Sequence, residues 1–112
     1  MTDAQLAREY TETVLHSKLE ASSEGVEKAQ ERVVGIADAN CDVLRHSQRD
    51  GYFSTSWTPA QNAPWLKSVQ ESFGQNTGLT PKQVSRALII SARYKCPDFT
   101  STIEAFTTLY DS

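Results

Sequence analysis

The tetrapeptide Thr80-Pro81-Lys82-Gln83 is the feature that most constrains how this chain can fold. It has the form of a capping box, in which the Thr80 hydroxyl accepts the backbone N–H of Gln83 and the Gln83 side chain reaches back to Thr80. Pro81 stands at the first helical position, where its missing N–H costs nothing. A helix is therefore predicted from Pro81 to about Tyr94.

Apolar residues recur at three- and four-residue spacing in four other segments, and this spacing is typical of amphipathic helices. No stretch of useful length alternates between apolar and polar residues as a strand would. The predicted helices are Asp3–Ala21, Glu24–Gln48, Pro64–Phe73 and a last one that begins near Asp98. The predicted fold class is all-α, a single-domain bundle over residues 1–112.

The two N-terminal segments predict the longest helices of the chain. At about 1.5 Å per residue they would measure about 28 and 35 Å. Because only Ser22 and Ser23 separate them, we expect a long antiparallel hairpin followed by two or three shorter helices. A thin hairpin needs a further surface to cover it, so a homo-oligomer is an open alternative.

The segment Gly51 to Pro59 is irregular and uncharged, and it carries Tyr52, Phe53 and Trp57. We treat residues 51–63 as an aromatic loop, in which a weaker capping box at Thr58 seeds a single turn before Pro64 restarts the helix. In one interpretation the rings pack over the hairpin and fill the core. In the other they form an exposed patch that binds a partner protein or unpaired bases.

Charge is distributed unevenly along the chain, whose net charge is −3. Residues 1–50 hold six Lys/Arg and ten Asp/Glu, whereas residues 51–112 hold five and four. Between residues 64 and 95 only Glu71 opposes five cations, which are Lys67, Lys82, Arg86, Arg93 and Lys95. The pattern predicts an acidic hairpin over residues 1–50 and a locally basic helical subdomain over residues 64–112.

Composition is that of an ordinary globular protein, with 38% hydrophobic and 22% charged residues. No run reaches the roughly 18 apolar residues of a membrane span, and the N-terminus does not resemble a signal peptide. We therefore expect a cytoplasmic protein with no membrane partner. In that compartment Cys41 and Cys96 are expected as reduced thiols with at least one buried, although a disulfide between them stays open.

Residues suited to catalysis are few. Glu12, His16 and Glu20 stand four apart, as do Asp42 and His46. That spacing can hold a metal but equally favours exposed ion pairs, which we expect here. The chain contains no Cys-x-x-Cys, His-Glu-x-x-His, nucleophile motif or glycine-rich phosphate loop. We predict no catalytic residues, no metal, no cofactor and no enzymatic activity.

Two resemblances concern the second half of the chain. Residues 78–98 are similar to the first helix and turn of a helix-turn-helix, but Ile89 and Ile90 occupy the turn and Pro97 cuts the second helix short. The same half of the chain resembles more closely a short helical pair that recurs in phage- and plasmid-encoded proteins. Several of those proteins are linked to replication or nucleic-acid handling. The residues that carry this second resemblance are Trp65-Leu66, Ser68, Phe73, Gly78-Leu79-Thr80, Lys82-Gln83 and Leu88. It covers about a quarter of the chain and implies a mobile-element origin.

Two functions follow as hypotheses. In the first, a non-enzymatic accessory or regulatory protein binds a protein partner through Tyr52, Phe53 and Trp57. In the alternative, the basic helices over residues 64–95 bind nucleic acid, with the five cations on phosphates and Trp57 or Trp65 stacked on bases. The net negative charge counts against the alternative, because phosphate neutralisation supplies most nonspecific affinity.

Overall fold

The computed structural model describes residues 2–110, and within that range the chain is helical with no strand. The elements are α1 (Asp3–Thr13), the 3₁₀ turn η1 (Leu19–Ala21), α2 (Val26–Arg49), α3 (Pro59–Thr77), α4 (Pro81–Lys95), the 3₁₀ turn η2 (Pro97–Phe99) and α5 (Thr100–Tyr110). The all-α class is confirmed, and the predicted bounds of α2 and α4 hold to within two residues.

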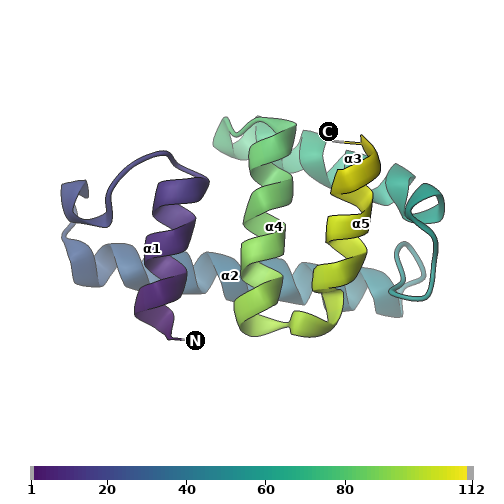
Figure 1. Ribbon diagram of the computed structural model, residues 1–112, viewed down its shortest axis with the longest axis horizontal. Helices are drawn as coiled ribbons and strands as arrows, with labels where there is room; N and C mark the ends of the chain where they lie inside the picture. The colour runs from purple at the N-terminus through teal and green to yellow at the C-terminus, as the bar shows by residue number, and fades with distance from the viewer. Residues whose placement is uncertain (1, 111–112) are drawn as a thin grey trace.

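Helix α2 sets the length of the molecule (Figure 1). Its 24 residues span about 36 Å, close to the 41 Å long axis of the fold. Helices α1, α4 and α5 lie side by side, with α1 and α4 crossing α2 and α5 packing on α3 and α4. Helix α4 is the central element, since it contacts all four other helices.

The first helix ends at Thr13, eight residues before its predicted end at Ala21. The β-branched Thr11, Thr13 and Val14 lower helix propensity at this end, and His16 adopts a left-handed φ of +53°. In a continuous helix Leu19 would be turned about 140° away from Val14 about the axis. Ending the helix allows the chain to bury both side chains.

The long antiparallel hairpin is not confirmed. Helix α1 has only 11 residues and crosses α2 rather than running along it (Figure 1). Its buried face, Leu6, Ala7 and Tyr10, belongs to a cluster that includes residues of both α2 and α4. A helix that packs on two crossing helices cannot follow one of them, so the expected acidic hairpin is instead part of a common bundle.

Helix α3 is longer than predicted at both ends. Thr58 forms a complete capping box with Gln61, so the helix begins at Pro59 and contains Pro64 in its interior. It also continues through Gly74 to Thr77, and only Gly78, with φ of +76°, ends it. The aromatic loop therefore covers residues 50–58, because residues 59–63 belong to α3.

The prediction of two reduced thiols is wrong, because Cys41 and Cys96 form a disulfide. Cys41 lies in the middle of α2 and Cys96 directly follows α4, and both are buried. Their Cα atoms are 5.9 Å apart, a separation that the crossing of α4 over α2 creates. The bond lies within the larger apolar cluster, which also contains Leu44, Phe53 and Leu88.

Candidate functional site

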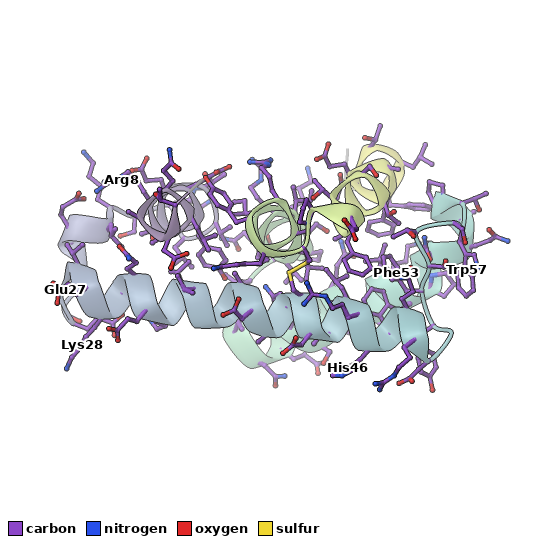
Figure 2. The ribbon with its side chains drawn as sticks, turned by 90° about the horizontal axis from the view of Figure 1, so that it is seen from below. Arg8, Glu27, Lys28, His46, Phe53 and Trp57 are labelled. Atoms are coloured by element: carbon purple, nitrogen blue, oxygen red, sulfur yellow. A yellow bond between two sulfur atoms is a disulfide. The ribbon has the colours of Figure 1, made fainter. Side chains whose placement is uncertain are left out.

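The loop between α2 and α3 presents two of its three aromatic side chains to solvent. Tyr52 is 66% exposed and Trp57 is 37% exposed, whereas Phe53 is completely buried. Phe53 packs against Trp65 and Phe99, with ring centroids 4.9 and 5.8 Å away. Figure 2 shows Phe53 reaching inward at this end of the molecule and Trp57 at its outer edge. We call Tyr52 and Trp57 the aromatic corner.

Side chains of the flanking helices fix the backbone of this loop. Asn62, fully buried in the first turns of α3, accepts the N–H of Ser54 at 3.0 Å and donates to its carbonyl at 2.9 Å. Gln48 of α2 accepts the N–H of Thr55 at 2.9 Å. The aromatic corner is therefore carried by an ordered loop. Sequence analysis did not identify Asn62, because an asparagine near a helix start reads as ordinary capping composition.

The three rings of the aromatic loop differ in burial, and the packing interpretation is confirmed for Phe53. Phe53 fills the core, as the packing interpretation expected. It has no exposed surface to offer a partner, so of the predicted partner-binding residues only Tyr52 and Trp57 are accessible for direct contact. Tyr52 and Trp57 keep the exposure that recognition requires.

The five predicted phosphate-binding cations do not form one patch. Lys67 lies on α3, where its ammonium is 4.7 Å from the centre of the Tyr110 ring. Lys95 pairs with Asp3 at 3.1 Å. Neither Lys67 nor Lys95 lines the groove along α4 that the other three cations line.

That groove consists of two adjoining clefts, of about 420 and 800 Å³, which share Thr13, Lys82 and Arg86. We call it the α4 groove. Its floor is α4, and its walls are α1 and α5. The lining residues are Glu9, Glu12, Thr13 and His16, then Thr80, Lys82, Gln83, Ser85, Arg86, Ile89, Ile90 and Arg93, then Glu104, Thr107 and Thr108.

Charges in the α4 groove are only partly compensated. Glu9 forms an ion pair with Arg93 at 2.5 Å and accepts the Tyr94 hydroxyl at 2.9 Å. Burial, together with this hydrogen bond to Glu9, raises the pKa of Tyr94. Lys82 and Arg86 form no ion pair within residues 2–110, so they are the available cations of the groove.

The spacing of Glu12, His16 and Glu20 does not produce a metal site. Helix α1 ends before His16. Arg8 forms ion pairs with both carboxylates, at 3.8 Å from Glu12 and 2.7 Å from Glu20. The hydrogen bond from Arg8 lowers the pKa of Glu20. Within the described range no three His, Cys, Asp or Glu side chains are placed to hold a metal ion.

Two further findings bear on the class of protein. Among the helices of residues 2–110, none has the length and apolar character needed to cross a membrane. Comparison of the chain with protein-family models, with curated proteins and with solved structures gave no match.

Proposed function

We propose that this protein is a non-enzymatic accessory or regulatory protein that acts by binding another protein through the aromatic corner. The observation that carries the proposal is the exposure of Tyr52 on a loop whose backbone is held by Asn62 and Gln48. Tyrosine and tryptophan dominate the binding energy of many interfaces. A loop that is already ordered pays little conformational entropy when it binds.

The neighbouring core supports this use of the loop. Buried Phe53 anchors the backbone directly next to Tyr52. One side chain of this adjacent pair packs in the core and the other is exposed to solvent. The tyrosine ring has few rotatable bonds and therefore offers contact area at a low entropic cost. Trp57 adds a half-buried ring on the same loop.

The proposed origin and location rest on separate observations. The likeness of Trp65–Ile90 to a helical pair of phage- and plasmid-encoded proteins supports a mobile-element origin. The Cys41–Cys96 disulfide supports an oxidising compartment in place of the cytoplasmic location expected from the sequence, because disulfides persist mainly outside reducing cytosol.

Nucleic-acid binding, the alternative function, has weaker support. Arg93 and Lys95 are engaged by carboxylates, and Lys67 lies on another helix. The groove that contains Lys82 and Arg86 also contains three glutamates, Glu9, Glu12 and Glu104. A phosphate backbone would meet both signs of charge there, on a protein with a net charge of −3.

Affinity capture with variants of the aromatic corner tests the proposal. Tyr52→Ala and Trp57→Ala should each reduce recovery of a specific partner from an extract of the native host by about tenfold or more. Leu109→Ala is the matched control, because Leu109 is 64% exposed and belongs to α5 and not to this loop. Thermal unfolding of all variants shows that the fold is intact. Full recovery by both aromatic variants would contradict the proposal.

A further inference from the structure

The α4 groove contains a like-charged pair without counter-charges. Lys82 and Arg86 lie four residues apart on α4, so their side chains are neighbours on the helix surface. Both are exposed, both line the two clefts of the groove, and neither forms an ion pair within residues 2–110. Like charges at this spacing destabilise a helix. An anionic group that contacts both side chains would relieve that repulsion.

The groove is formed before any ligand arrives. At one end the Gln83 side chain donates to the carbonyl of Val14 at 2.8 Å and ties the end of α1 to the start of α4. At the other end Glu9 bridges Arg93 and Tyr94. Because α1 is fastened to α4 at Gln83 and again at Arg93 and Tyr94, the α1 wall of the groove is held in place by the fold.

Hydroxyl groups on the α5 wall indicate which anion fits. Thr107 and Thr108 both donate to the carbonyl of Glu104, at 2.8 and 3.0 Å. In this arrangement the lone pairs of both hydroxyl oxygens are free to accept hydrogen bonds from a ligand. A peptide offers N–H donors to them, whereas a phosphodiester backbone has none.

We propose that the α4 groove binds a short acidic segment of a partner protein, with two carboxylates on Lys82 and Arg86. Half-buried Ile89, about one turn beyond Arg86, supplies apolar contact area for a neighbouring side chain of the peptide. The glutamates on the walls repel a continuous polyanion but tolerate a peptide that carries a few acidic groups. Charge complementarity at a preformed groove thus favours peptide over nucleic acid.

This surface is separate from the aromatic corner. The loop of residues 50–58 contributes no residue to the lining of the groove, and Arg8 of α1 and Trp57 lie toward opposite ends of the molecule (Figure 2). The inference therefore goes beyond the proposed function and does not depend on it.

Fluorescence anisotropy with synthetic probes tests the inference. The probe is a labelled alanine-based peptide that carries two Glu residues four positions apart and a Leu on either side of the pair. The comparison probes are the same peptide with Gln in place of Glu, and a single-stranded oligothymidylate of similar length. We expect saturable binding of the Glu peptide that weakens with added salt, and about tenfold weaker binding of the Gln peptide.

Variants locate the binding. Lys82→Gln and Arg86→Gln should each weaken the Glu peptide about tenfold, because each removes a charge-assisted contact. Lys67→Gln on α3 and Lys28→Gln on α2, both exposed lysines outside the groove, should leave it unchanged. Three outcomes would overturn the inference: no saturable binding up to about 1 mM, affinity that survives both groove variants, or tighter binding of the oligothymidylate. Each leaves the Tyr52 capture experiment unaffected, so the two proposals fail separately.

Discussion

The side-chain amide of Gln83 donates a hydrogen bond of 2.8 Å to the main-chain carbonyl of Val14, the C-cap residue that follows α1. The same side chain accepts the N–H of Thr80 in the capping box that begins α4. One residue therefore satisfies backbone groups at the end of one helix and the start of another. It also fixes where α1 meets α4.

The chain offers a matched pair for measuring this link, because the Thr58 and Thr80 boxes have the same form. Gln83→Ala should destabilise the protein by about 1 kcal/mol more than Gln61→Ala, since both lose a cap but only the first leaves the buried Val14 carbonyl without its donor. Urea denaturation measures the difference. Equal losses would show that the tertiary bond contributes nothing.

Adjacent residues of the aromatic loop should differ sharply in their contribution to stability. Phe53→Ala removes a fully buried ring and should cost about 3 to 5 kcal/mol in the free energy of unfolding. Tyr52→Ala changes an exposed side chain and should stay within about 0.5 kcal/mol. Chemical denaturation of both variants checks this. A large loss in Tyr52→Ala would mean that its ring is part of the core.

The disulfide should be a major source of stability. It links residues 55 positions apart, and closing a loop of that size in the unfolded chain is worth about 4 kcal/mol. A Cys41→Ala, Cys96→Ala double variant should therefore unfold at much lower urea than the oxidised protein. Thiol titration of the native, unreduced protein should find neither cysteine free. Two free thiols, or equal stability with and without reductant, would refute this assignment.

The raised pKa of Tyr94 predicts that the folded protein loses stability at alkaline pH. Burial, with the hydrogen bond to Glu9, raises the pKa of Tyr94 above its usual value near 10. The folded protein then holds this proton to higher pH than the unfolded chain. The stabilisation is complete below about pH 10 and is lost as pH rises through the folded pKa.

Tyr94→Phe should therefore flatten the decline of unfolding free energy above about pH 10. Tyr10, whose pKa burial also raises, would keep part of that decline. Denaturation midpoints between neutral and alkaline pH measure the slope. A slope identical to that of the unaltered protein would show that Tyr94 does not contribute.

Local signals predicted the parts of the fold that depend on neighbouring residues. The capping box at Thr80 and the apolar stripe after it located α4, and a similar stripe located α2. The box at Thr58 also predicts a helical turn, but Pro64 does not restart the helix there, because α3 accommodates this proline in its interior. The all-α class and most of the helix starts can thus be predicted from interactions between residues that are close in the sequence.

Contacts between residues that are far apart in the chain could not be predicted from the sequence. Nothing near Val14 indicates that Gln83, 69 residues later, caps the end of α1. The disulfide depends on where α4 crosses α2, and the neutralisation of Arg93 depends on Glu9, 84 positions away. The roles of Tyr52 and Phe53 likewise follow from which ring faces Trp65 and Phe99. Each of these needs the packed fold.

Site-specific photo-crosslinking in the native host tests the central claim most directly. A photoreactive phenylalanine analogue placed at position 52 should yield a discrete covalent adduct with one partner protein, and the same analogue at position 109, equally exposed on α5, should not. Adducts are separated by mass and identified by peptide sequencing. Absence of any adduct from position 52, or the same adduct from position 109, would contradict the assignment of the aromatic corner as the binding surface.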